Sequence, residues 1–202
     1  MGLLSFVGFL FLGFLFTEIF GYFLHVLLHS EKVPYLSRSH MIHHLKIYGP
    51  QKGLRASGPY LGSANDRFSI AGFGMEWMAP ILGVTAILFT VFWLLGVPVW
   101  GQLVFSASAS FWGYIMFGYM HDAMHVEGFW MERNRVLRPW FLRIRKLHDI
   151  HHLEFSNDGR MLKNYGICFF FVDRLMGSLS VRHHPFNRKG FAQAQKLYSF
   201  IH

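Results

Sequence analysis

Ten of the chain's thirteen histidines fall in four short clusters with helical spacing. The clusters are His25-x-x-x-His29, His40-x-x-His43-His44, His121-x-x-x-His125 and His148-x-x-His151-His152. Residues three or four positions apart share one face of a helix, so each cluster can present its imidazoles together. Neutral imidazole is a common ligand of iron, zinc and copper. Because structural zinc normally takes four ligands, ten imidazoles predict a site for two metal ions.

Iron is the metal that this ligand set favours. The chain has a single cysteine, Cys168, which excludes an internal disulfide and argues against an iron–sulfur cluster. An imidazole-rich site with room for dioxygen fits non-haem iron, and zinc would substitute for it in purified protein. Two iron ions with dioxygen as co-substrate can oxidise an unactivated C–H bond, giving an alcohol by hydroxylation or an alkene by desaturation. The iron ions, and no side-chain nucleophile or acid, would then carry out the oxidation.

Four polar residues outside the metal site are candidates to hydrogen-bond to the ligand histidines or to line the cavity beside them. Glu18 lies seven residues before His25 on the same helical face. An intramembrane carboxylate usually faces protein or water; the alternative is a protonated carboxyl, or one bonded to a neighbouring span. Asp122 and Asp149 directly follow ligand histidines and could accept their ring N–H groups, or could simply pair with arginine. Asn164 is the fourth candidate.

Three apolar segments are long enough to cross a membrane. They are Leu3–Leu28, residues 77–95 and residues 99–120, and about 20 residues are needed to cross the hydrocarbon layer. The turn Gly96-Val97-Pro98 predicts that the second and third segments form a helical hairpin. We therefore expect an all-α fold: a single membrane-embedded domain over residues 1–202, with about three transmembrane helices and a cytoplasmic, histidine-rich helical cap.

The distribution of charge predicts the orientation. All nineteen lysines and arginines lie in residues 31–67 or after His125, and basic loops stay cytoplasmic. The N-terminus and the hairpin turn should therefore face outward, and every histidine cluster should lie on the cytoplasmic side. The net charge of +8 fits attraction to anionic lipid headgroups, or docking of an acidic electron-carrier protein. No nucleic-acid motif is present, so no nucleic-acid partner is expected.

The remaining segments give less definite expectations. Residues 30–39 and 48–67 suggest loops, and residues 40–45 suggest a short interfacial helix. Residues 133–146 suggest an amphipathic surface helix that leads into the last histidine triple. Residues 164–179 could be re-entrant, interfacial or a fourth span, and the basic, polar chain after Ser180 should be weakly ordered.

A few single residues keep two interpretations. Ser110, Tyr114 and Gly118 form a small and polar stripe, which fits close helix packing or the lining of an acyl-chain site. His183 and His184 lie outside the four clusters and could contact a metal ion or the substrate.

The histidine pattern resembles that of the fatty acid hydroxylase / sterol desaturase superfamily. The likeness covers roughly residues 25–178 and includes Asn164-Tyr165-Gly166 and the run from Asp173 to Ser178. It implies an integral membrane di-iron oxygenase with the ten clustered histidines as ligands. It also implies electrons from a reductase chain, through cytochrome b5 or ferredoxin. Four spans are common in that superfamily, whereas this chain shows three. The segment from His121 to His125 is also similar to carotenoid hydroxylases, which usually have one more residue between the paired histidines.

These observations predict a membrane di-iron, dioxygen-dependent hydroxylase of a lipid, either a fatty acyl lipid, a sterol or a related lipid. A lipid desaturase and a carotenoid hydroxylase use the same scaffold and stay open as alternatives. A non-catalytic metal-binding membrane protein is the remote alternative. The endoplasmic reticulum and a bacterial inner membrane fit the sequence equally well.

Overall fold

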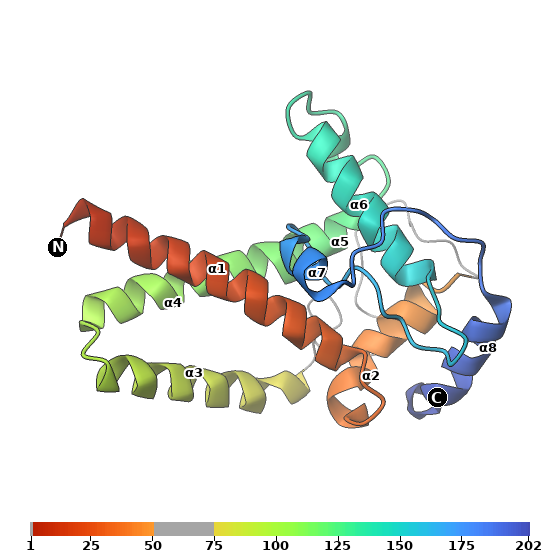
Figure 1. Ribbon diagram of the computed structural model, residues 1–202, viewed down its shortest axis with the longest axis horizontal. Helices are drawn as coiled ribbons and strands as arrows, with labels where there is room; N and C mark the ends of the chain where they lie inside the picture. Colours follow the sequence, from red (N-terminus) through yellow and green to blue (C-terminus); the bar gives the residue numbers. More distant parts are fainter. Residues whose placement is uncertain (1, 51–74) are drawn as a thin grey trace.

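The computed structural model describes residues 2–50 and 75–202, and its regular elements there are all helices (Figure 1). In chain order they are α1 (Leu3–Leu28), α2 (Pro34–Ile42), η1 (His43–Ile47), η3 (Met75–Trp77), α3 (Met78–Leu94), α4 (Val99–Gly113), η4 (Tyr114–Met120), α5 (His121–Met124), η5 (Trp130–Glu132), α6 (Arg138–Leu153), α7 (Phe171–Met176), α8 (Arg188–Leu197) and η6 (Ser199–Ile201). An isolated bridge joins Phe155 and Met161. The all-α prediction is confirmed.

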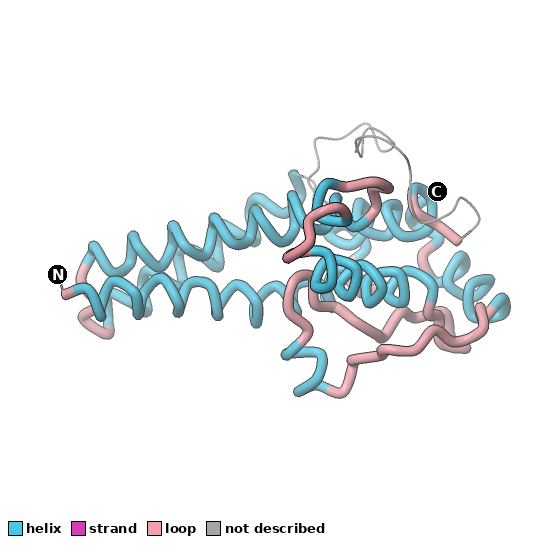
Figure 2. Tube along the Cα trace, turned by 90° about the horizontal axis from the view of Figure 1, so that it is seen from above, coloured by secondary structure: helices cyan, strands magenta, loops and turns pink. Residues whose placement is uncertain are grey.

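Three long apolar helices form one end of the molecule. They are α1, the η3–α3 unit and the continuous α4–η4–α5 unit, with 26, 20 and 26 residues. They correspond to the three expected spans. The N-terminus and the α3–α4 turn lie together at the far end, and the shorter helices gather at the opposite end as a cap (Figures 1 and 2). The predicted arrangement of spans and cap is therefore present.

Helices α1 and α4 pack closely because small residues line their contact. A Cβ atom on Gly13 would lie 2.5 Å from the carbonyl oxygen of Phe105, so only glycine allows this approach. The hydroxyl of Thr17 donates to the carbonyl of Ala109 over 3.1 Å, and that of Ser108 donates to the carbonyl of Leu10 over 2.7 Å. These bonds fix the register of the two spans that lead into histidine clusters.

The hairpin turn between α3 and α4 forms as the sequence predicts. Gly96 has φ +67°, a conformation that L side chains rarely adopt. The N–H of Val97 donates to the carbonyl of Phe92 over 2.9 Å and closes the end of α3. None of the residues of α3 is fully buried, and one partly buried face of the helix includes Phe92, whose ring lies 4.9 Å from that of Phe105 on α4.

Residues 164–179 form a loop whose two ends meet, which we call the re-entrant loop. The N–H of Asn164 donates to the carbonyl of Ser178 over 3.1 Å, so the two ends of the segment meet. Between them, the ring of Phe169 contacts that of Phe14, with centroids 5.8 Å apart, halfway along α1. Helix α7 has six residues and is too short to cross a bilayer. This excludes a fourth span among the alternatives that the sequence left open.

The C-terminal segment is ordered, contrary to the expectation of a weakly ordered tail. In α8 and η6, Phe191, Ala194, Tyr198 and Ile201 recur at helical spacing, and all four are buried in one core cluster with α2. The hydroxyl of Tyr198 donates to the carbonyl of His29 over 2.8 Å. The overall basic composition concealed this apolar stripe.

The loop expected at residues 30–39 is shorter than predicted. Pro34 begins α2, because proline is well suited to the first turn of a helix. The short helix expected at 40–45 is the continuation of α2 into η1. Of the loop expected at 48–67, residues 51–67 lie outside the described part of the chain.

Candidate metal centre

The ten clustered histidines meet in two groups of five at the junction of the spans and the cap. The first group contains His25, His29, His40, His44 and His151. Within it, one ring nitrogen of each residue lies within 4.8 Å of those of the others, and all five side chains are buried. Helices α1, α2, η1 and α6 supply four of them, and His29 directly follows the end of α1.

The second group contains His43, His121, His125, His148 and His152, under the same distance limit and equally buried. Each group therefore takes ligands from both halves of the chain. His43 leaves its sequence cluster for the second group, and His151 leaves its own for the first. The π-helical turns of η1 and η4 lie at ligand clusters, where such irregular turns often occur in functional sites.

The spacing of the ring nitrogens fits metal ligation. In the first group, Nε2 of His40 lies 3.1 Å from Nε2 of each of His25, His29 and His44. In the second, Nε2 of His125 lies 3.2 Å from that of His43 and 3.0 Å from that of His148. An imidazole nitrogen binds a metal ion such as zinc at about 2.1 Å. Two ligand nitrogens at a right angle about the ion are therefore about 3.0 Å apart. The rings are placed as neighbouring ligands of one ion would be.

Backbone carbonyls fix which nitrogen is free to bind. Nδ1 of His25 bonds to the carbonyl oxygen of Tyr165 at 2.5 Å, and Nδ1 of His151 bonds to that of Lys163 at 2.6 Å. A carbonyl can only accept, so both Nδ1 atoms carry the proton. In these two neutral rings Nε2 then has a bare lone pair, and each of these Nε2 atoms lies 3.1 Å from Nε2 of another histidine of the group. Both nitrogens are therefore available to bind a cation.

Burial keeps these rings neutral. It lowers the pKa of His151 to about 4, partly offset by the hydrogen bond to Lys163. Burial, followed by repulsion from neighbouring imidazoles, lowers the pKa of His44, His148 and His152 well below the ordinary value. Neutral imidazole is the form that binds metal, so at pH 7 these four rings are in the form that can bind an ion.

Comparison with protein families identifies the chain. The family described as "Fatty acid hydroxylase" matches residues 10–178. The chain belongs to the fatty acid hydroxylase family. Neither a curated protein nor a solved structure matches it. Membership in the family, the two histidine groups and the three apolar helices together fit a metal-binding membrane hydroxylase, which is an oxidoreductase.

The loop that carries the Tyr165 carbonyl is held by a residue that the sequence analysis did not single out. The carboxylate of Asp173 accepts the N–H groups of Tyr165 and Gly166, each over 2.7 Å, and the hydroxyl of Ser178 over 2.7 Å. A Cβ on Gly166 would lie 2.7 Å from the same carboxylate, so glycine is needed there. In this family member, Asp173 thus positions His25 through a backbone carbonyl.

Asn164 acts in a similar way, through the backbone. Its side-chain amide donates to the carbonyls of Leu147 and Ser180 over 2.9 and 2.8 Å, and its oxygen accepts the N–H of Ser180 over 2.7 Å. The residue has φ +56°, which asparagine tolerates better than most residues. Asn164 therefore joins the re-entrant loop to α6 just before His148, without touching a ligand ring.

The three carboxylates that the sequence singled out lie around the site in different ways. Glu18 accepts the indole N–H of Trp112 over 2.7 Å, so it bonds to a neighbouring span. Oδ1 of Asp122 lies 3.8 Å from Nδ1 of His121, beyond hydrogen-bond distance. Asp149 is half-buried on α6 next to His148, whose Nδ1 has no hydrogen-bond partner among the described residues.

Two further contacts position the second group. The ring of Tyr48 stacks on that of His125, with centroids 3.8 Å apart. The buried guanidinium of Arg145 bonds to Glu132 at 2.6 Å and donates to the carbonyl of Val126 over 2.7 Å. Arg145 thereby holds the chain directly after His125. Spacing alone cannot reveal either contact, because the partners are distant in sequence.

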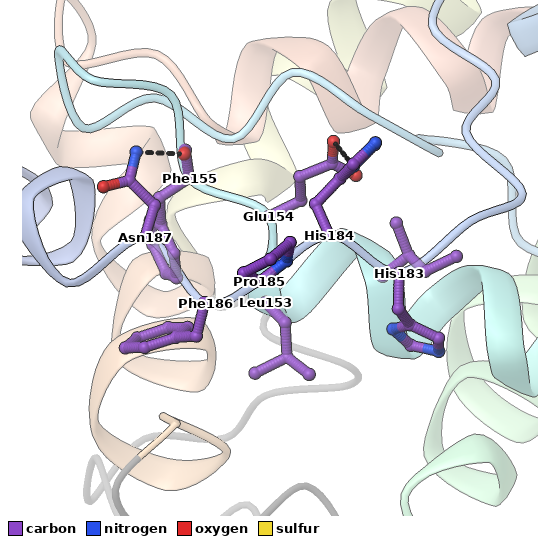
Figure 3. A pocket seen from close by; sticks show the side chains of 9 residues that line it. Leu153, Glu154, Phe155, His183, His184, Pro185, Phe186 and Asn187 are labelled. Carbon is purple, nitrogen blue, oxygen red and sulfur yellow. Dashed lines mark hydrogen bonds and ion pairs between the residues drawn. The ribbon is translucent and has the colours of Figure 1, made fainter.

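His183 and His184 lie away from both groups. They line a pocket at the end of α6, where Nδ1 of His184 pairs with Glu154 at 2.9 Å (Figure 3). Both are exposed, unlike the ten clustered histidines. The structure does not bring them to the candidate metal centre.

Proposed function

We propose that this protein is a membrane di-iron oxygenase that uses dioxygen to hydroxylate an unactivated C–H bond of a lipid. The observation that supports this most is the pair of buried groups of five imidazoles, in each of which the ring nitrogens lie within 4.8 Å of one another. Imidazole-rich sites suit iron, and zinc would occupy the same nitrogens in purified protein. All ten histidines are then metal ligands, with Asp173 and Asn164 as positioning residues.

Bound iron would supply the activation of dioxygen and of the C–H bond. One oxygen atom enters the substrate as hydroxyl, and the other leaves as water with two protons and two electrons from outside. The chain's own residues bind and orient. The carbonyls of Tyr165 and Lys163 hold two of the rings, and burial of both groups excludes bulk water.

An apolar groove along α1 supports a lipid substrate. Two adjoining pockets of about 170 and 220 Å³ share Phe20, Ile81 and Val84, and so lie between α1 and α3. The groove extends along α1 as far as Leu24 and Leu27, on either side of His25 in the sequence. Its lining is almost entirely apolar, which suits an acyl chain or a sterol ring system. We propose that the substrate enters here from the bilayer.

Charge supports a cytoplasmic position for the metal centre. The hairpin turn at residues 95–98 has no lysine or arginine, whereas the cap contains most of them. The electrons would then come from a cytoplasmic carrier such as cytochrome b5 or ferredoxin, with its reductase. The protein would be a single domain of the endoplasmic reticulum or of a bacterial inner membrane.

Comparative lipid analysis under heavy dioxygen tests the proposal. Cells that express the protein are compared with cells that express a His125→Ala/His148→Ala variant, and both are grown under ¹⁸O₂. A hydroxylase adds one heavy oxygen to one lipid class in wild-type cells alone. Loss of two hydrogens instead would identify a desaturase, and labelled carotenoids would identify a carotenoid hydroxylase. An unchanged lipid profile, with metal bound and no substrate-dependent oxygen uptake, would favour a metal-binding protein without catalysis.

A further inference from the structure

A cluster of exposed basic residues lies over the end of α6. We call it the basic rim, and it comprises Arg182, His183, His184, Arg188 and Lys189. The segment that carries it runs across the last turn of α6 and into α8, at the end of the molecule farthest from the N-terminus (Figure 1). It therefore faces away from the membrane spans.

Two residues of the rim, His183 and His184, line a pocket of about 420 Å³, and the other three lie within a few positions of its lining in the sequence. Leu153 and Glu154 line it together with His183, His184 and Phe186, and the acidic Glu154 is paired with His184 (Figure 3). Phe186 is 41% exposed, so the surface combines positive charge with an apolar centre. This is the composition of many protein–protein contact sites, in which an apolar core has a charged border.

The fold itself gives no reason for this charge. Arg182, Arg188 and Lys189 form no ion pair with any described residue, and residues 180–202 contain no aspartate or glutamate. Arg188 and Lys189 occupy the first turn of α8, where the helix dipole disfavours cations. An acidic residue there would stabilise the helix better. The positive charge is therefore available for an external partner of opposite charge.

The pocket beside the rim is lined by residues that are neighbours in sequence of histidines from both groups. Ile150 and Leu153, which line the pocket, flank His151 of the first group and His152 of the second. From His152 the chain passes through Leu153 to Glu154, and a bond of 2.9 Å joins Glu154 to the exposed ring of His184. A short covalent and hydrogen-bonded route thus connects this surface with the centre.

We propose that the basic rim is the docking surface for an acidic one-electron carrier protein. This rests on the proposed function, since hydroxylation consumes two electrons per turnover and the chain has no cofactor-binding cysteine cluster to supply them. Two successive dockings each oxidise one carrier by one electron. The electrons, with two protons from water, reduce the second oxygen atom of dioxygen to water.

Kinetics with defined carriers tests the docking surface. The iron-loaded protein in detergent is assayed with reduced soluble cytochrome b5 or a plant-type ferredoxin, and separately with a small chemical reductant and mediator. Arg182→Glu/Arg188→Glu/Lys189→Glu should raise the KM for the carrier by about tenfold or more, because electrostatic attraction speeds association. Turnover with the chemical reductant and the iron content should stay unchanged.

A matched control has the same change in charge at the other end of α6. Arg133, Arg135 and Arg138 are equally exposed, and their replacement by glutamate should leave the carrier's KM near the wild-type value. An equal rise in KM in both variants would overturn the proposal. So would a wild-type KM that does not rise with salt, a measurement that needs no variant to fold.

Failure of the proposed function would look different. If the chemical reductant supports no turnover, the oxygenase assignment fails. Carrier binding, measured by calorimetry on the same iron-loaded protein, still decides the docking surface. Binding weakened by rim reversal supports the surface, and binding unaffected by it contradicts the surface.

Discussion

At the scale of single residues, the candidate metal centre depends on which ring nitrogen holds the proton. The carbonyls of Tyr165 and Lys163 accept from Nδ1 of His25 and His151, so each Nε2 lone pair points into the first group. A carbonyl oxygen belongs to every residue, whatever its side chain. The clustered histidines are therefore visible in the sequence, but the groups that orient them are not.

The neutral rings predict a dependence of stability on pH in the metal-free protein. Burial lowers the pKa of His151 from 6.5 to about 4. Between these values the unfolded chain binds a proton and the folded chain does not, so the free energy of unfolding falls as the pH falls. His151 alone would account for about 3 kcal/mol across this window. Thermal unfolding in detergent should show the midpoint falling from pH 6.5 downward.

The exposed His202 provides the matched control, His202→Gln, for the slope of the unfolding midpoint against pH. His151→Gln should make it shallower. A midpoint that stays constant or rises on acidification would contradict neutral, buried rings in the metal-free protein.

At the scale of elements, the re-entrant loop and α8 hold the ligand helices together. Asp173 accepts two backbone N–H groups and a hydroxyl, and so fixes the loop that contacts His25. Tyr198 bonds to the end of α1 at His29. Neither segment provides a metal ligand, yet both set where α1 ends relative to α6.

Asp173→Asn should destabilise the loop and loosen the first group. The new amide leaves one backbone N–H without an acceptor, which costs about 2 kcal/mol. We expect a lower unfolding midpoint and weaker metal binding, measured by thermal unfolding and by competition with a chelator. Asp158→Asn, at an exposed position, is the control; equal effects of the two substitutions would contradict a positioning role for Asp173.

Tyr198→Phe removes only the bond to the carbonyl of His29. Loss of this buried hydrogen bond should lower the free energy of unfolding by about 1 kcal/mol, measured by denaturant titration in detergent. Tyr35→Phe changes a side chain that is 69% exposed and should have almost no effect. If Tyr198→Phe were equally silent, α8 would not be anchored as the structure describes.

Much of this architecture can be predicted from the sequence, because the spans are long and uninterrupted and the histidines recur at helical spacing. The folding of the C-terminal segment into the ordered helix α8 could not be predicted, since Phe191, Ala194 and Tyr198 form a sparse stripe within a basic segment. It could also not be predicted that His43 and His151 each join a different group from the other histidines of their sequence clusters. That exchange depends on how η1 and α6 meet in space, and neither spacing nor composition records it.

At the scale of the whole molecule, three spans carry a cap that holds both histidine groups. The hairpin turn lies at the end of the spans that is remote from the cap, and Leu95 in it is 72% exposed. Positive charge is concentrated in the cap, at the opposite end. We therefore expect the cap to be cytoplasmic.

Labelling of single cysteines tests this orientation. Cys168 is buried, and Cys168→Ser provides the background. An impermeant maleimide should label Leu95→Cys from outside, and should label Lys196→Cys on α8 only after the membrane is permeabilised. The reverse pattern would place the metal centre on the other side of the membrane.

Iron content is the most direct test of the central claim that two groups of five histidines each hold one ion. Wild-type protein loaded with iron should contain about two ions per chain, as the two groups imply. His43→Ala/His152→Ala removes ligands from opposite halves of the sequence but from one group, so about one ion should remain by plasma mass spectrometry. Loss of both ions from this variant, or a wild-type content of one or none, would contradict the account.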